Sequence, residues 1–232
     1  MSSATSQIIR INSSIKVNVI RSRLTSQNAL DLLGHYDILL DCTDNAPTRY
    51  LLSDVAVVLR KPLVSGAAQK YEGQLVVYNL GSDGPCYRCL FPKPPVPEVA
   101  GTCEETGILG AVTGIIGNLQ ALETIKLITG LQGDIKSERF NCHSLLTPTT
   151  ETKPSMLIFS ALSSPPFRSV KLRSRKKDCV ACGNQDFDLR SITETDYIQT
   201  CGGPKPDWIR RGLLHGQAER RITVRVRLFS GQ

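Results

Sequence analysis

Two Cys-x-x-Cys pairs are the most chemically specific feature of the 232-residue sequence. The first pair is Cys86 with Cys89, and the second is Cys179 with Cys182. Two intervening residues let a tight turn aim both sulfurs at one ion, so two pairs can complete a tetrahedral zinc site with four cysteine ligands. Because four thiolates leave no open position for water, we predict a structural zinc ion. The wide separation of the pairs predicts that the metal joins segments far apart in the chain.

Other interpretations of the two pairs remain open from the residues alone. They could be buried free cysteines, or one pair could be a thioredoxin-like redox motif. The first residues show no signal-peptide pattern, so we expect a cytosolic protein in which reduced thiols bind metal rather than form disulfides. Arg88, Lys176 and Lys177 lie close to the pairs in sequence, and we expect them to offset the charge of a zinc tetrathiolate.

A second candidate site follows a segment that has the pattern of a buried strand, 36–42. Asp44 and Asn45 come directly after it. In open α/β sheets, ligands bind at this edge. Asp44 could hold Mg²⁺ on a nucleotide phosphate, and Asn45 could orient the nucleotide. The same residues also suit an Asx turn or the N-cap of the next helix, and the sequence leaves both possibilities open.

Three more cysteines invite a functional interpretation. Cys103 precedes a long predicted helix, whose N-terminus would stabilise a thiolate nucleophile, although the two glutamates that follow it oppose thiolate formation. Cys42 falls in the predicted strand, and we interpret it as a packing residue. Cys142 neighbours His143, but adjacent strand residues point to opposite faces, so we interpret this pair as structural.

The elements that must position these residues follow an α/β pattern. Short apolar runs predict strands at 36–42, 61–68, 71–79, 139–146, 156–162 and 167–172. Helices are predicted at 29–33, 47–60 and 107–130, and a Pro- and Gly-rich loop at 81–106. The strand–helix–strand order over 36–68 predicts parallel pairing with a right-handed connection. We therefore predict an incomplete Rossmann-like parallel sheet with helices, followed by antiparallel strands and the four-cysteine zinc site.

The predicted helix 107–130 carries three glycines at helical spacing, Gly110, Gly114 and Gly117. Each costs about 1 kcal/mol relative to alanine in a helix. We expect close packing against another backbone to offset this cost. Polar residues within the segment argue against a membrane span: Asn118, Gln120, Glu123 and Lys126.

The charge of the chain is unevenly distributed. Residues 1–165 carry 14 basic and 14 acidic residues, whereas residues 166–232 carry 14 basic and 7 acidic ones. Such a surplus can mark a nucleic-acid or acidic-partner surface. We prefer a solvated basic face or an unpacked tail, because aromatic residues are sparse near the basic cluster and no nucleic-acid motif accompanies it.

These residues together resemble the ubiquitin-activating-like adenylyltransferases and sulfurtransferases, the family that serves the ubiquitin-related modifier and the molybdopterin-synthase small subunit. The resemblance covers about residues 6–185. It rests on motifs that occur in family order, at 23–29, 36–45, 73–75, 85–89, 110–117 and 178–183.

The resemblance implies an activity, and roles for the candidate residues. A member of this family adenylylates the C-terminal glycine of a ubiquitin-like sulfur carrier with ATP, which leads to a thiocarboxylate used in tRNA wobble-uridine thiolation and molybdenum cofactor biosynthesis. Asp44 and Asn45 match the nucleotide-contacting pair, and Cys103 matches the cysteine that takes up the acyl group or hands over sulfur. Cys86, Cys89, Cys179 and Cys182 match the zinc ligands. A cysteine desulfurase as sulfur donor and a homodimer are also implied, with no membrane or direct nucleic-acid contact.

The sequence departs from the family pattern at both ends. No Gly-rich phosphate loop precedes Ser6, no Gly-x-Gly-x-x-Gly occurs anywhere in the chain, and Cys201 does not supply the cysteine loop of a rhodanese domain. We therefore expect residues 1–187 to be a partial adenylyltransferase domain, and residues 188–232 a linker and remnant before a missing rhodanese domain. On this hypothesis the chain is a truncated form with impaired ATP binding.

Two other functions remain as alternatives. A non-catalytic scaffold, stapled by zinc, could bind a ubiquitin-like partner. A basic nucleic-acid-binding module is the third possibility, and its binding would fall steeply with salt.

Overall fold

The computed structural model describes residues 2–94, 107–130, 154–183, 187–203 and 223–227. The chain divides into two compact units, one formed by residues 26–203 and the other by residues 1–25 with 204–232. In the smaller unit, helix α1 (Ser2–Ile11) precedes strand β1 (Lys16–Ile20), which pairs antiparallel with β7 (Thr223–Arg227). The sequence analysis predicts neither strand, because the pairing joins segments at opposite ends of the chain.

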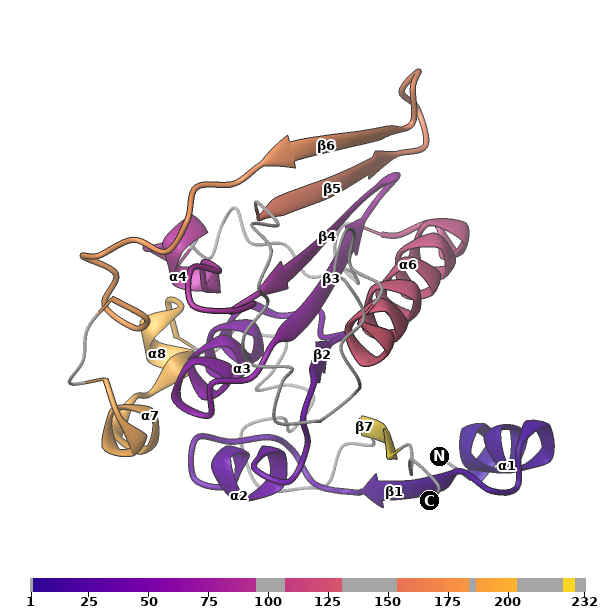
Figure 1. Ribbon diagram of the computed structural model, residues 1–232, viewed down its shortest axis with the longest axis horizontal. Coiled ribbons are helices and arrows are strands. Elements are labelled where there is room, and N and C mark those ends of the chain that lie inside the picture. The colour runs from indigo at the N-terminus through magenta and orange to yellow at the C-terminus, as the bar shows by residue number, and fades with distance from the viewer. Residues whose placement is uncertain (1, 95–106, 131–153, 184–186, 204–222, 228–232) are drawn as a thin grey trace. The chain divides into compact units, whose positions relative to one another are not determined.

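The larger unit is built around a five-stranded sheet in the order β2-β3-β4-β5-β6 (Figure 1). Its strands are β2 (Leu39–Asp41), β3 (Leu63–Gln69), β4 (Glu72–Tyr78), β5 (Ser155–Ser160) and β6 (Phe167–Lys171). β2 and β3 are parallel, and the three later pairs are antiparallel. The predicted fold class, a parallel unit followed by antiparallel strands, is confirmed. The strand predicted at 139–146 lies outside the described residues.

Helix α3 (Ala46–Val58) makes the crossover between the two parallel strands. Its first turn contains a proline, whose fixed φ and missing N–H suit that position. The apolar face of the helix is buried, and Tyr50, Val55 and Ala56 on it are completely inaccessible to solvent. The helix starts and ends within two residues of the predicted range, since both the cap and the apolar spacing are local signals.

The two faces of the sheet are covered by different helices (Figure 1). On one face lies α6 (Gly110–Thr129), whose Leu127 forms a buried cluster with Val64 and Leu75. On the other face lie α3 and the short α4 (Tyr87–Leu90). There the rings of Tyr78 and Tyr87 pack edge to face, with their centroids 5.7 Å apart. The sequence analysis predicts a plain loop at α4, because a single helical turn has no periodicity to detect.

Three further short helices lie in the described part of this unit. α2 (Ala29–Leu33) has the predicted bounds. α7 (Leu189–Glu194) and α8 (Tyr197–Thr200) contact α3, and they bury Ile192 and Tyr197. The described residues 187–203 therefore pack against α3, whereas a domain boundary after residue 187 stays a prediction.

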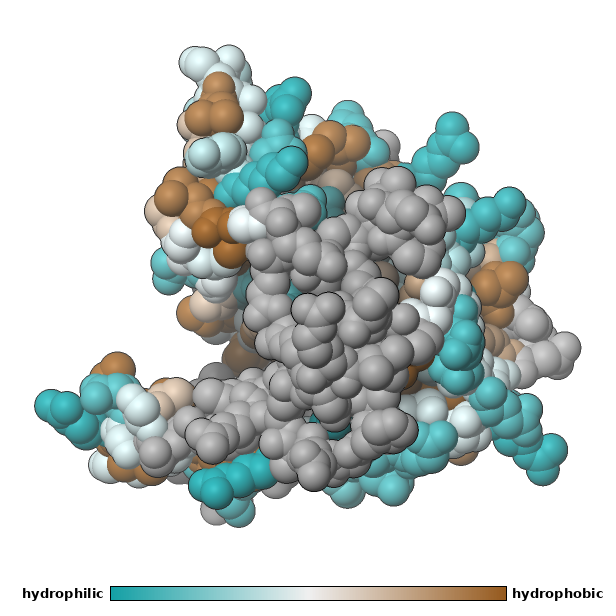
Figure 2. Space-filling view, turned by 180° about the vertical axis from the view of Figure 1, so that it is seen from behind, coloured by the Kyte–Doolittle hydropathy of each residue, from teal (hydrophilic) through white to brown (hydrophobic). Residues whose placement is uncertain are grey.

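The surface of the described residues mixes polar and apolar side chains (Figure 2). All five residues of the outer strand β6 are exposed, including Arg168 and Lys171. Charged side chains on an outer strand discourage edge-to-edge pairing with other chains. In the part of the chain that the structure describes, no helix is both long and apolar enough to span a membrane.

The glycines of α6 do not have the close neighbours that the sequence analysis expects. Apart from the adjacent residues and the backbone of the helix itself, no described atom lies within 4 Å of a Cβ built on Gly110, Gly114 or Gly117. The close approach occurs instead on the strands facing this helix, where a Cβ on Gly66 would lie 2.3 Å from Oε1 of Gln120. The expectation assigned the tight packing to the wrong partner, since helical spacing alone does not show which element lacks space.

This difference predicts opposite outcomes for two glycine-to-alanine changes. Gly117→Ala should raise the free energy of unfolding by about 0.5–1 kcal/mol, because alanine removes the glycine penalty without a clash. Gly66→Ala should lower it, because the new methyl group meets the buried Gln120. Urea unfolding followed by circular dichroism measures both. Destabilisation by Gly117→Ala would show that this face of α6 is occupied in solution.

Candidate functional site

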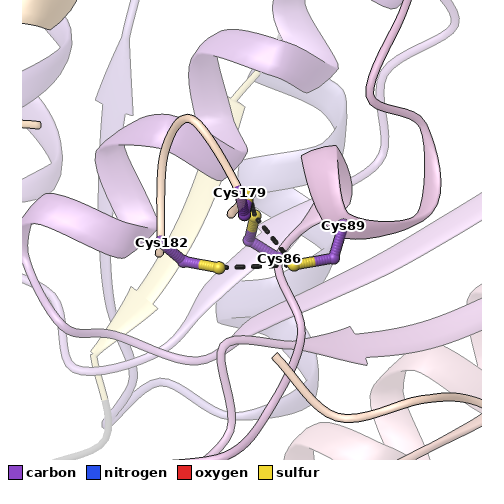
Figure 3. Close-up of side chains that lie close together, drawn as sticks. All are labelled: Cys86, Cys89, Cys179 and Cys182. Carbon is purple, nitrogen blue, oxygen red and sulfur yellow. Dashed lines mark hydrogen bonds between the residues drawn. The ribbon is translucent and has the colours of Figure 1, made fainter. Parts of the chain in front are cut away.

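The four paired cysteines converge on one point in the structure (Figure 3). Their sulfurs all lie within 4.8 Å of one another. Individual Sγ–Sγ distances are 3.8 Å for Cys86–Cys89, 3.5 Å for Cys86–Cys179 and 3.3 Å for Cys89–Cys182. Tetrahedral zinc with Zn–S bonds of about 2.3 Å needs sulfurs about 3.8 Å apart. The four residues therefore fit one zinc ion, which they would hold in a closed, structural site.

The first cysteine pair is shaped by the start of α4. Cys86 occupies the N-cap position, and the backbone N–H of Cys89 donates to the carbonyl of Cys86 at 3.1 Å. The N–H of Tyr87 donates to Oγ of the buried Ser53 at 3.1 Å. One turn of helix thus turns both sulfurs to the same side and attaches them to α3.

The second cysteine pair lies in a tight turn that requires a glycine. The N–H of Cys179 donates to the carbonyl of Lys176 at 3.2 Å, and the N–H of Gly183 donates to that of Cys179 at 3.0 Å. A Cβ on Gly183 would lie 2.5 Å from the carbonyl oxygens of Lys176 and Lys177. Only glycine fits this position without a shift of the backbone.

Hydrogen bonds among the four sulfurs set their protonation. Bonds from Cys182 and Cys86 hold the pKa of Cys179 well below its usual range, while the bond to Cys179 raises the pKa of Cys86. These hydrogen bonds therefore favour loss of the proton from Cys179 over loss of the proton from Cys86. A metal ion replaces the remaining protons, so its affinity should fall as the pH falls.

Arg88, between the first two cysteines, has a different partner from the one the sequence analysis expects. Its guanidinium forms a bidentate ion pair with the carboxylate of Asp54 on α3, with N–O distances of 2.9 and 2.8 Å. The positive charge of Arg88 is therefore paired with Asp54 instead of being available to offset the charge of the thiolates. The hydroxyl of Tyr197 on α8 donates to the same carboxylate at 2.9 Å. Although burial opposes the charge, Asp54 raises the pKa of Arg88. Asp54 is fully buried, so this network attaches α4 and α8 firmly to α3.

The sequence analysis does not identify Asp54 or Tyr197. A single carboxylate within the apolar stretch 50–59 was the available signal for Asp54. A buried charge needs a partner, but nothing in the local sequence shows that the partners lie 34 and 143 residues away.

The candidate nucleotide residues lie where the parallel strands end. Asp44 and Asn45 follow β2, and Asp44 is exposed. Oδ1 of Asn45 accepts the N–H of Thr48 at 3.0 Å, and its Nδ2 donates to Oδ1 of Asp44 at 3.3 Å. The N-cap interpretation therefore holds for Asn45, while Asp44 is left at the surface beside it.

A buried network supports this edge, and the sequence analysis does not predict it. Asp41, 1% exposed, accepts hydrogen bonds from the hydroxyls of Thr43 at 2.6 Å and Ser65 at 2.7 Å. Arg49 lies 3.8 Å from the same carboxylate. From α6, Nε2 of Gln120 donates to the carbonyl of Asp41 at 2.8 Å. These contacts join β2, β3, α3 and α6 directly behind Asp44.

The remaining cysteines are placed as follows. Cys42 was expected to pack in the core, but β2 ends one residue earlier and Cys42 is exposed, with its sulfur 3.8 Å from Oε1 of Gln120. Burial raises the pKa of Cys201 to about 11, so its thiol stays protonated at neutral pH. Cys103, Cys142 and His143 lie outside the described residues, and the role predicted for Cys103 remains a prediction.

The fold and the site define an α/β protein with a parallel strand–helix–strand unit and a cluster of four cysteines that could hold a metal ion. Residues 1–181 match the ThiF family, and the chain belongs to that family.

Relatives with curated names extend over most of the chain. It is 44% identical over 200 residues to the "Adenylyltransferase and sulfurtransferase MOCS3" of Drosophila willistoni, covering 86% of this chain and 39% of that protein. It is 48% identical to MOCS3 of Culex quinquefasciatus over 200 residues, covering 86% and 40%. It is 45% identical to "Adenylyltransferase and sulfurtransferase uba4" of Pyricularia oryzae over 219 residues, covering 88% and 43%. The chain spans about two fifths of the length of these relatives.

Solved structures with a similar fold include MccB of Escherichia coli. The crystal structure described as MccB with ATP has a TM-score of 0.53 and 15% sequence identity, covering 78% of this chain and 50% of that one. MccB with MccA-N7isoASN gives a TM-score of 0.54 and 14% identity, covering 78% of this chain and 50% of that one. At this identity the similarity establishes the fold alone.

The four-cysteine cluster predicts a measurable zinc content. The purified chain should bind about one zinc ion, and Cys182→Ser should abolish that binding and lower the midpoint of thermal unfolding, because the metal holds two distant segments together. Elemental analysis by mass spectrometry and calorimetry provide the two measurements. Cys42→Ser is the matched control, since Cys42 is exposed and outside the cluster. A zinc content equal in all three proteins would contradict the assignment.

The buried ion pair predicts that α8 contributes to the stability of the unit. Tyr197→Phe removes only the hydroxyl that donates to Asp54, and should lower the free energy of unfolding by about 1.5–3 kcal/mol, the range for hydrogen bonds to charged groups. Urea titration measures the change. Tyr71→Phe, at an exposed tyrosine, should change the value little. An unchanged stability for Tyr197→Phe would mean that α8 is not docked on α3 in solution.

Proposed function

We propose that this chain takes part in the ATP-dependent adenylylation of the C-terminal glycine of a ubiquitin-like sulfur carrier. The main evidence for this proposal is the sequence identity of 44–48% to the relatives named adenylyltransferase and sulfurtransferase, together with the ThiF family match. The exposed Asp44 at the end of a parallel strand pair and the four-cysteine centre are consistent with that activity.

The proposed reaction turns a poor electrophile into a reactive one. A carboxylate oxygen of the terminal glycine attacks the α-phosphorus of ATP, the bond from that phosphorus to the bridging oxygen breaks, and pyrophosphate leaves. The product is an acyl-adenylate, a mixed anhydride that a sulfur nucleophile can attack with release of AMP. Catalysis of such a step rests on positioning and on neutralising phosphate charge.

We assign the candidate residues to this scheme as follows. Asp44 would hold Mg²⁺ on the phosphates, because a hard cation with few protein carboxylates suits phosphate chemistry. Asn45, fixed by its bond to Thr48, would keep the loop in place while its amide group faces Asp44. Cys103 would take up the acyl group or hand over sulfur. Cys86, Cys89, Cys179 and Cys182 would hold zinc, which would supply stability and take no part in the chemistry.

The wider setting follows from the same proposal. The thiocarboxylated carrier would serve tRNA wobble-uridine 2-thiolation and molybdenum cofactor biosynthesis in the cytosol. Its partners would be the ubiquitin-related modifier and the molybdopterin-synthase small subunit, a cysteine desulfurase would donate the sulfur, and the chain would act as a homodimer.

A second candidate function is a zinc-stapled scaffold that binds a ubiquitin-like partner without catalysis. One observation favours it: no Gly-x-Gly-x-x-Gly occurs in the 232 residues, so the chain by itself offers no such loop to cradle phosphates. On this alternative, carrier binding would need the metal centre and would be indifferent to Asp44.

The role of Asp44 can be tested in a chimera that includes a phosphate loop. Residues 6–185 would replace the matched part of the Culex quinquefasciatus relative, and carrier-dependent ATP–pyrophosphate exchange would be measured. Asp44→Asn should lower exchange about 100-fold, the effect typical of losing one charge-stabilising contact. Asp31→Asn, an exposed carboxylate on α2, is the control and should leave the rate unchanged.

The outcomes separate the two candidate functions. Exchange that depends on Asp44 supports adenylylation. A chimera that binds the carrier but shows no exchange, with binding unaffected by Asp44→Asn and lost after Cys179→Ala, supports the scaffold. Equal loss of exchange in Asp44→Asn and Asp31→Asn would rule out a specific role for Asp44.

A further inference from the structure

We propose that Asn79 and Arg175 form a clamp that positions the two cysteine pairs and slows the release of their metal ion, although neither residue is a ligand. The Asn79–Arg175 clamp consists of these two side chains and the hydrogen bonds of their backbone amides. It goes beyond the proposed function, because it concerns the chain's affinity for metal and requires no enzymatic activity.

Asn79 is the fixed half of the clamp. It follows β4 directly, is 7% exposed, and has a positive φ of 54°, a conformation that asparagine tolerates better than most residues. Its Nδ2 donates to the carbonyls of Ala56 and Lys61, both at 2.9 Å. Its backbone N–H donates to the carbonyl of Pro85 at 2.9 Å. Asn79 therefore fixes the residue that precedes Cys86 against the end of α3.

Arg175 joins the other segment to this fixed point. Its Nη2 donates to Oδ1 of Asn79 at 3.0 Å, and its backbone N–H donates to the carbonyl of Asp83 at 2.9 Å. The side chain and the backbone thus contact two different residues of the 79–86 segment. These bonds align the segment after β6 with the loop that leads to the first cysteine pair.

The alignment reaches the metal ligands through the next peptide. The N–H of Lys176 donates to Sγ of Cys89 at 3.5 Å, and the carbonyl of Lys176 accepts the N–H of Cys179 at 3.2 Å. Arg175 directly precedes Lys176, so its bonds to Asn79 and Asp83 fix the start of this turn. Outer hydrogen bonds of this kind orient ligands and raise metal affinity. The clamp therefore positions both a hydrogen bond to one sulfur and the start of the second pair.

The arrangement of Arg175 is suited to positioning. Its Nε is buried without a hydrogen-bond partner among the described residues, which has a cost in free energy. Neighbouring Arg173 is exposed, so the two arginines of this basic stretch differ in environment. An arginine that contributed only its positive charge could stay exposed to solvent, as Arg173 does, with no buried Nε. The geometry of its Nη2 and backbone contacts accounts for the burial.

The test compares metal release from variants of the full 232-residue chain loaded with zinc. Arg175→Met should release zinc to a chromogenic chelator about 10–100-fold faster, the range for outer partners of metal ligands. Asn79→Gly removes the amide while allowing the positive φ, and should have a similar effect. The two changes combined should add little to either alone, because both break one clamp.

A spectroscopic measurement separates positioning from loss of the site. Cobalt(II) substituted for zinc should show the visible bands of a tetrahedral tetrathiolate in both variants, since all four ligands remain. Loss of those bands in Arg175→Met would overturn the proposal, because the residue would then be required to form the site at all.

Two controls make the result specific. Arg173→Met is the matched control, from the same basic stretch, and should release zinc at the rate of the unaltered chain. Leu127→Ala lowers stability from the core between α6 and the sheet, outside the cysteine cluster, and should change the melting temperature with little effect on release. The proposal fails if Arg175→Met releases zinc at the unaltered rate, or if Leu127→Ala accelerates release equally.

Discussion

The convergence of two cysteine pairs, 93 residues apart in the chain, is the constraint on which the larger unit depends. Closing so long a loop has an entropic cost that tertiary contacts must offset. The four sulfurs stand at separations suited to one zinc ion, and a metal bonded to all four would offset this cost directly. The turn at Gly183 and the single helical turn of α4 present the sulfurs in the required geometry.

Helix α3 supports both candidate sites. Its N-terminus is capped by Asn45, beside Asp44, and its later turns carry Ser53 and Asp54, which hold the first cysteine pair. Because α3 contributes to both, it links the candidate nucleotide edge to the four-cysteine cluster. Burying the ion pair of Asp54 and Arg88 carries a desolvation cost. The bidentate hydrogen bonding of the pair, with Tyr197 as a third partner, offsets that cost.

The two faces of the sheet contribute differently to the structure. Its α6 face provides the apolar core, from Leu127 with Leu75 to Val112 with Phe159. One polar side chain from α6, Gln120, reaches the carbonyl of Asp41 and so connects that core to the nucleotide edge. After β3 the pairing changes from parallel to antiparallel, β4 lies against α6, and Phe159 of β5 packs with Val112 of the same helix. The same switch brings the segment after β6 back to the cysteines that follow β4.

The sequence by itself determined the features whose signals are local. The crossover helix, the parallel strands and the two Cys-x-x-Cys turns all follow from apolar spacing, a cap and a ligand pattern within a few residues. Tertiary structure decided which distant residues meet: Asp54 with Arg88 and Tyr197, Asn79 with Arg175, and Gln120 with Gly66. It also showed that Cys42 is exposed and that the glycines of α6 face open space among the described residues. Such pairings depend on how elements pack, and a buried polar group shows only that it needs a partner, without showing where that partner lies in the chain.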